Sequence, residues 1–261
     1  MNLQSIDSLP IAVVIGLFAV ITLIIYDLGF RVGRWWQERM PGEQEGPAGV
    51  LIGALLGLMA FMLAVVMGMA ADRFDTRRGL VLAEANAIGK AYLEAGYMQE
   101  PQAEQLRELL REYLPQRIAT NDLPQTMAAI QRSIELHAEM WAVVEPVARS
   151  GYNSDLMSSL GESVTDLVSM NQSRVVAGVY SRVPETILLL LLAGSALSLG
   201  MVGYGAGLTG RRSVVTAVIL VVALGAVLTV VIDLDRPQEG FLRVSQQPLL
   251  DVQRWIGTPT P

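Results

Sequence analysis

Four long apolar runs divide the chain into two pairs of hydrophobic segments. They cover residues 11–30, 49–71, 186–210 and 213–232, and Asp27 is the only ionisable residue within them. A helix of about 20 apolar residues crosses the roughly 30 Å hydrocarbon core of a bilayer. The pattern therefore predicts an all-α membrane protein with four transmembrane helices, arranged as two hairpins.

A polar stretch, residues 72–182, separates the hairpins, and its apolar positions recur at helical spacing. Helices are expected over 72–95, from Pro101 to about Pro115, from near Leu123 to about Pro146, and from Ser154 to Tyr180. Their apolar stripes predict either a small bundle or contacts with neighbouring subunits. The domains are thus a first transmembrane hairpin (1–71), an extramembrane helical insert (72–182), a second hairpin (183–235) and a short C-terminal tail (236–261).

Composition narrows the class of protein further. The chain is 52% hydrophobic and 17% charged, with a mean hydropathy of +0.41, whereas soluble domains carry about 25% charged residues. A soluble enzyme is therefore excluded. The net charge of −6 and the lack of basic runs interleaved with aromatics argue against a nucleic-acid partner. With no cysteine, disulfides and thiolate metal sites are excluded.

The distribution of arginine predicts an orientation. Four spans return the chain to its starting side, so both termini and the insert share one face of the membrane. The two short connections between spans carry five arginines, Arg31, Arg34, Arg39, Arg211 and Arg212. Basic residues in short loops favour the cytoplasm. The expected location is a bacterial inner membrane, with the termini and the insert on its outer face.

No motif predicts catalysis, a metal or a cofactor. His137 is the only histidine and lacks the HExxH spacing, and neither a glycine-rich phosphate loop nor a GxSxG motif occurs. Asp27 lies one turn before Arg31, which is typical of an ion pair at the membrane interface, the alternative being a functional acid within the membrane.

Small residues recur on the second and third spans. The second carries Gly49, Gly53, Gly57, Ala60, Ala64 and Gly68, and the third ends in Gly200, Gly203, Gly205 and Gly207. Such residues let helix backbones approach closely. The second span is expected either to pack within its own subunit or to crowd around an oligomer axis. The third-span glycines predict either a packing surface or a place where the helix unwinds.

Charged residues gather where the second and fourth spans leave the membrane on the side of the insert. They are Asp72, Arg73, Asp75, Arg77 and Arg78 after the second span, and Asp233, Asp235 and Arg236 after the fourth. Interfacial charges often only fix the depth of a helix. In an oligomer they would instead form rings at a pore mouth.

Three strings carry a resemblance to a known family: FMLAVVMGMAADRFDTRR, EANAIGKAYLEA and IDLDRPQEGFLRVSQQPL. Over about residues 49–250 the chain resembles the bestrophin-like family of uncharacterised bacterial membrane proteins. Bestrophins are pentameric anion channels whose second span lines the pore. They narrow it with several bulky residues, where this chain offers Phe61 alone, and they carry the insert in the cytoplasm.

The pattern and the resemblance together predict a homo-oligomeric ion channel, with anions such as chloride favoured over cations. The pore-lining candidates are Gly57, Phe61, Ala64 and Gly68; the pore-mouth candidates are Asp72, Arg73, Arg77, Arg78, Asp233, Asp235 and Arg236. Arginines facing the axis would favour anions, and Asp72 and Asp75 facing it would favour cations. The alternative is a membrane-anchored interaction or sensor protein that acts through its insert.

Overall fold

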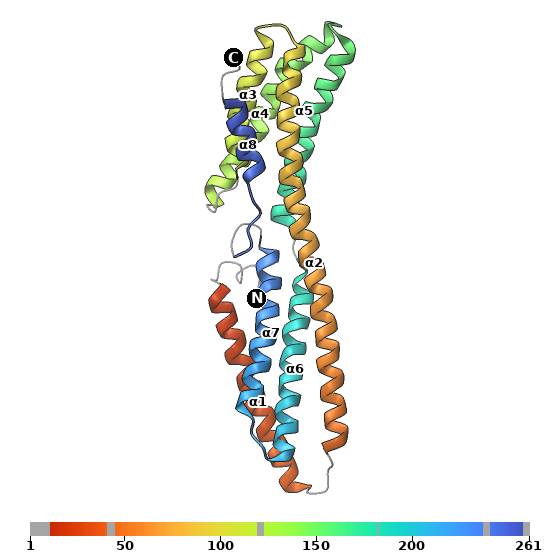
Figure 1. Ribbon diagram of the computed structural model, residues 1–261, viewed down its shortest axis with the longest axis vertical. Coiled ribbons are helices and arrows are strands. Elements are labelled where there is room, and N and C mark those ends of the chain that lie inside the picture. The colour runs from red at the N-terminus through yellow and green to blue at the C-terminus, as the bar shows by residue number, and fades with distance from the viewer. Residues whose placement is uncertain (1–10, 41–44, 119–122, 182, 237–240, 258–261) are drawn as a thin grey trace. The chain divides into compact units, whose positions relative to one another are not determined.

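The computed structural model describes residues 11–40, 45–118, 123–181, 183–236 and 241–257, and within these ranges it is helical with no strand. The chain divides into two compact units (Figure 1). One, the membrane unit, contains the described residues up to 72 and those from 183 to 236. The other, the insert unit, contains residues 73–181 and the described residues after 240. Helix α2 (Glu45–Glu94) contributes to both.

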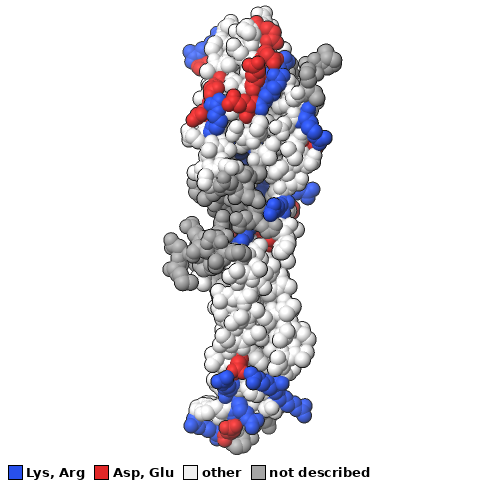
Figure 2. Space-filling model, turned by 90° about the vertical axis from the view of Figure 1, so that its left-hand side faces the viewer, with Lys and Arg blue, Asp and Glu red and all other residues white. Residues whose placement is uncertain are grey.

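The membrane unit contains the four predicted spans. They are α1 (Ile11–Arg39), the first part of α2, α6 (Glu185–Thr209) and α7 (Val214–Asp235). All four are long and apolar enough to cross a membrane, which confirms the prediction of two hairpins of transmembrane helices. The surface over these spans carries almost no charged side chain between its two ends (Figure 2).

Glycines hold α1 and α6 in backbone contact. A Cβ atom at Gly203 would overlap the carbonyl oxygen of Tyr26, and one at Gly207 would overlap that of Phe30. On the facing helix, a Cβ atom at Gly29 or Gly33 would meet α6 backbone in the same way. The third-span glycines are therefore a packing surface, and α6 stays helical through them to Thr209.

The insert unit is a small bundle built around leucine. It contains the second part of α2, the 3-10 turn Ala95–Tyr97, α3 (Gln102–Arg117), α4 (Leu123–Arg149), α5 (Ser154–Val175), the π-helical turn Val176–Tyr180 and α8 (Gln247–Gly257). Its fully buried side chains include Ile88, Leu106, Leu110, Tyr113, Leu114, Leu136, Met140, Leu160, Leu167 and Leu249. The buried parts of the apolar stripes therefore meet one another within the subunit, whereas Met127, Ile134 and Trp141 on α4 remain exposed.

Two features of the insert differ from the prediction. Helix α4 continues past Pro146 to Arg149, as α3 continues past Pro115 to Arg117. Pro146 donates no backbone hydrogen bond, but its carbonyl oxygen still accepts from Ser150 N (3.2 Å). The second difference is α8, where no helix was predicted. It packs on the insert through Leu249 and Ile256, and Arg111 Nε donates to Ile256 O (3.2 Å).

Candidate functional site

The four pore-lining candidates lie on a single exposed face of α2. Gly57, Phe61, Ala64 and Gly68 are all exposed, and Phe61 keeps 67% of its surface accessible. The opposite side of the same stretch is buried and carries Met59, Leu63, Val66 and Ala70. We call the exposed side the open face of α2 and the buried side its packed face. The membrane unit covers only one side of this helix.

Within the described residues, four glycines in the transmembrane part of α2 face open space. A Cβ atom at Gly49, Gly53, Gly57 or Gly68 would meet nothing within 4 Å. The contact between α2 and α6 depends instead on glycines of α6, where Met59 packs against Gly194 and Ile52 against Gly205. Among the described residues, packing within the subunit is therefore not the role of the α2 small-residue stripe.

The charged candidates on α2 divide between the two faces. Asp72, Asp75 and Arg78 are exposed, whereas Arg73 is half-buried and Arg77 is only 7% exposed. Asp75 follows Gly57 by eighteen residues, about five helical turns, so the two share one direction around the helix. Asp72 and Arg78 lie on either flank of that direction, and Arg73 and Arg77 lie on the packed side. The acidic residue is thus central on the open face.

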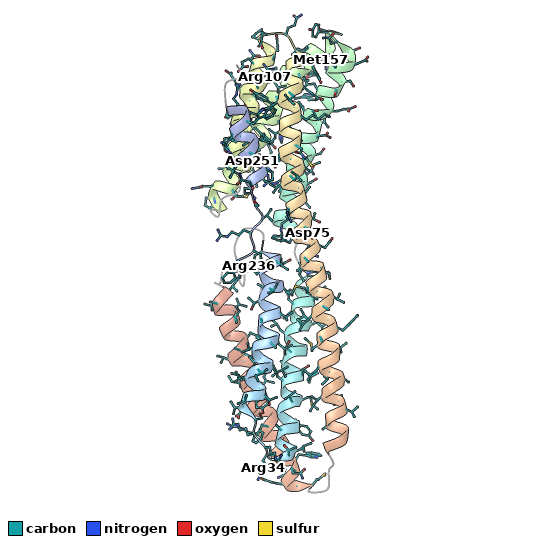
Figure 3. The ribbon with its side chains drawn as sticks, viewed as in Figure 1. Arg34, Asp75, Arg107, Met157, Arg236 and Asp251 are labelled. Carbon is teal, nitrogen blue, oxygen red and sulfur yellow. The ribbon has the colours of Figure 1, made fainter. Side chains whose placement is uncertain are left out.

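The charged candidates at the end of α7 are largely buried. Asp233 is 2% exposed and Arg236 is 5% exposed, and Asp235 accepts a hydrogen bond from Val183 N through Oδ1 (2.9 Å). Asp235 thereby ties the segment before α6 to the end of α7. Figure 3 shows Asp75 on α2 and Arg236 at the end of α7. Their burial and the hydrogen bond of Asp235 are typical of charged residues that stabilise the fold.

Asp27 joins two elements at the other end of the membrane unit. Its Oδ2 pairs with Arg31 Nε on α1 (2.7 Å), and its Oδ1 accepts from Arg212 in the turn between α6 and α7. The Asp27 side chain retains 23% exposure. These contacts agree with the interfacial ion pair and add a second arginine that sequence spacing does not reveal.

The insert contains a buried carboxylate that sequence reasoning missed. Glu84 on the packed face of α2 is fully buried and accepts from Arg117 Nε (2.7 Å) and from Arg174. Tyr113 also donates its hydroxyl to Glu84 (3.0 Å). The one available signal was a lone carboxylate between apolar positions, Val81, Ala85 and Ile88, on a helix.

The surroundings of Glu84 fix its charge. Burial by itself raises the pKa of this carboxyl, but attraction and hydrogen bonds from Arg117 and Arg174 outweigh burial and set the net pKa below its ordinary value. One carboxylate faces two guanidinium groups, so the cluster keeps a buried positive charge. It connects α2, α3 and α5, and Arg174 also reaches Gln246 just before α8 (3.4 Å).

His137 lies beside this cluster as a buried, neutral ring. Its ring centre is 5.0 Å from that of Tyr113. Burial, assisted by the nearby charge of Arg117, lowers the pKa of His137 to about 4. The ring is therefore uncharged at neutral pH. In the described part of the chain, no group of three or more His, Asp or Glu side chains is arranged to hold a metal ion.

The sequence matches the model of one known protein family. The model of the bestrophin-like domain fits residues 16–249. The chain belongs to the bestrophin-like family. A search of curated proteins finds no match for this bestrophin-like chain.

Solved structures agree with this family at the level of fold. A bestrophin homolog from Klebsiella pneumoniae is 13% identical, with a TM-score of 0.66 over 95% of this chain and 97% of that one. Two point variants of the homolog each give a TM-score of 0.69 at 11% identity, covering 92% and 94% of this chain and 96% and 98% of theirs. The bestrophin-like fold is therefore shared over nearly the whole length.

Proposed function

We propose that this bestrophin-like chain forms a homo-oligomeric ion channel in which α2 lies nearest the axis. Bestrophin homologs are oligomeric anion channels, and family membership supports the same class of protein here. The observation that carries the proposal is the open face of α2, where a Cβ atom at Gly49, Gly53, Gly57 or Gly68 would meet no described atom of the same subunit within 4 Å. Helices in membranes associate through such residues because they permit close backbone approach.

Phe61 gives the proposed pore its narrowest level. It is the one large side chain among the four pore-lining candidates, and Leu58 and Val65 are also exposed on this stretch of α2. A ring of phenylalanines around an axis would form an apolar constriction, which regulates conduction by dewetting. The glycines and alanines on either side would leave the path wider.

The transported ion has two candidates. Membership of the bestrophin-like family supports anions such as chloride. Cations are favoured by the direction of the charges on α2, since Asp75 lies centrally on the open face while Arg77 is buried and Arg73 is half-buried. Rings of Asp at a pore mouth attract cations and rings of Arg attract anions. The selectivity between cations and anions therefore depends on whether the permeating ion meets Asp75 or arginine side chains.

Disulfide cross-linking tests the position of α2, because the chain has no cysteine of its own. In an Ala64→Cys variant, oxidation in native-like nanodiscs is expected to join subunits. The matched control is Leu63→Cys, one residue away on the packed face, where we expect no cross-link. Cross-linking at position 63 but not 64, or a monomer by mass measurement, would contradict the proposal and favour the sensor alternative.

Reversal potentials in a planar bilayer under a KCl gradient identify the ion. A current that reverses near the chloride equilibrium potential supports the anion candidate, and one that reverses near the potassium potential supports the cation candidate. The measurement is made on protein already shown to be oligomeric, and Phe61→Ala is included to widen the constriction. An oligomer in which both forms are silent would overturn the channel proposal.

A further inference from the structure

One end of the membrane unit carries five arginine side chains that are exposed on its surface. The set comprises Arg31, Arg34, Arg39, Arg211 and Arg212, on the last turns of α1 and in the turn between α6 and α7. Arg31 and Arg212 keep 75% and 54% of their side-chain surface exposed. Figure 2 shows basic side chains gathered next to the uncharged surface of the spans.

The carboxylates described at this end do not neutralise the arginines. Asp27 is shared between Arg31 and Arg212, so this group keeps one positive charge. Arg34 is paired with Glu38 (3.0 Å), while Arg39 lies over the ring of Trp35, 3.9 Å from its centre. Residues 27–48 and 209–213 together hold five arginines against four carboxylates, Asp27, Glu38, Glu43 and Glu45, so the sequence at this end carries one excess positive charge.

Exposed apolar side chains lie beside these arginines in sequence. Leu28 and Val32 on α1 are 54% and 53% exposed, and Val214 and Val215 at the start of α7 are 56% and 70% exposed. Trp35, half exposed, has the amphipathic character typical of residues at headgroup depth. A ligand that combines a phosphodiester with acyl chains fits this combination, whereas a free anion would use only the arginines.

We propose that Arg31, Arg211 and Arg212 bind the phosphate of an acidic phospholipid whose acyl chains lie along α1 and α7. Guanidinium groups suit phosphate because they donate several hydrogen bonds in one plane. Asp27 pairs with Arg31 through Nε and accepts from Arg212, and it thereby offsets part of the positive charge of these arginines. This inference is independent of the channel proposal.

Native mass spectrometry of the full-length protein tests the proposal. The protein is extracted from nanodiscs that contain equal amounts of phosphatidylglycerol and phosphatidylcholine. We expect the wild type to retain the acidic lipid preferentially. In Arg211→Gln/Arg212→Gln this preference should fall by about 25-fold, since each arginine near a membrane surface contributes about fivefold. The matched control is Arg149→Gln, an exposed arginine paired with Glu145 in the insert, which should retain wild-type preference.

An Asp27→Asn variant separates lipid binding from a purely structural role of the cluster. Removing the carboxylate raises the local positive charge, so retention of phosphatidylglycerol should rise by about fivefold. A cluster that only fastened α1 to the turn would lose stability without gaining lipid. Equal retention of both lipids by the wild type, or unchanged retention in the double variant, would overturn the proposal.

Excess inorganic phosphate shows whether the arginines bind the phosphate of a lipid or a free phosphate ion. A lipid held by both its phosphate and its acyl chains should remain bound in tens of millimolar phosphate at matched ionic strength. Displacement of the lipid by phosphate, but not by a chloride salt of equal ionic strength, would show a site for a free anion and would contradict the assignment to a phospholipid.

Discussion

The packed and open faces of α2 differ in their burial and in the side chains that they carry. The packed face carries Met59, Leu63 and Val66 in the membrane unit and Val81, Glu84 and Ile88 in the insert unit, all buried. The open face carries Gly57, Ala64, Gly68 and Asp75, and all of these are exposed. We infer that the packed face determines whether the subunit folds and that the open face serves what the folded subunit assembles into.

Glu84→Gln is expected to have the largest effect on the folding of the insert unit. It leaves Arg117 and Arg174 buried without their counter-charge, and breaking a buried ion pair from one side costs about 3–5 kcal/mol. The matched variant on the exposed side is Asn86→Gln, which should change the unfolding free energy by less than about 0.5 kcal/mol. Denaturant unfolding of both variants, followed by circular dichroism, compares the two faces within one helical turn; equal stabilities would contradict the distinction.

The next largest effect is expected from pH, through His137. Because folding lowers the pKa of His137 to about 4 from an ordinary 6.5, the unfolded chain binds the extra proton more readily at intermediate pH. The stability contributed by the neutral ring is complete above pH 7 and decreases as the pH falls. The loss should reach about 2 kcal/mol at pH 5.

Unfolding free energies at pH 7 and pH 5 measure this loss. The stability of a His137→Gln variant should depend less on pH over the same interval. If the unfolding free energy of this variant fell between pH 7 and pH 5 as much as that of the wild type, the loss would arise from carboxylates and not from His137.

Gly57→Leu is expected to leave folding nearly unchanged and to disrupt assembly. A side chain at Gly57 meets nothing in its own subunit, whereas one at Gly203 overlaps the backbone of α1. Gly203→Leu is therefore the control that should abolish the folded membrane unit. Thermal unfolding separates the two variants, and size-exclusion chromatography with light scattering should detect a smaller particle for Gly57→Leu. An oligomer of unchanged size would place the subunit contacts elsewhere.

The smallest effect on folding is expected for Asp75→Asn, which alters only charge on the open face. If the proposed path runs along this face, the substitution removes a ring of carboxylates and should reduce the cation-to-anion permeability ratio several-fold. The matched substitution is Arg77→Gln on the packed side. A larger change in the reversal potential from Arg77→Gln than from Asp75→Asn would reverse our assignment of the charges.

Hydrophobic patterning was enough to predict the four spans and the helices of the insert, because the signal for each lies within its own segment. The direction of the α2 faces was not predictable in this way. The transmembrane part of α2 is apolar on all sides, so nothing in the sequence marks which side meets α6. Only the contacts of Met59 and Ile52 with α6 glycines reveal it.

Which charged side chains are buried was also not predictable, because burial depends on residues that are distant in the sequence. Arg73 and Arg77 were predicted as pore-mouth candidates because they follow the end of the second span, but the structure places both toward the packed side of α2. Glu84 was overlooked because its arginine partners lie 33 and 90 residues away in sequence. The helix α8 escaped because a segment of eleven residues carries few helical repeats.

The backbone contact between α1 and α6 has a consequence for movement. Side chains can change rotamer and let neighbouring helices shift gradually, but Gly29, Gly33, Gly203 and Gly207 lie directly against the backbone of the facing helix. A small slide would drive the flanking side chains into the opposing backbone. Because the glycines on α1 are four residues apart, the next matching alignment is displaced by about one helical turn, roughly 5–6 Å. This pair of helices therefore moves in discrete steps or as one rigid piece.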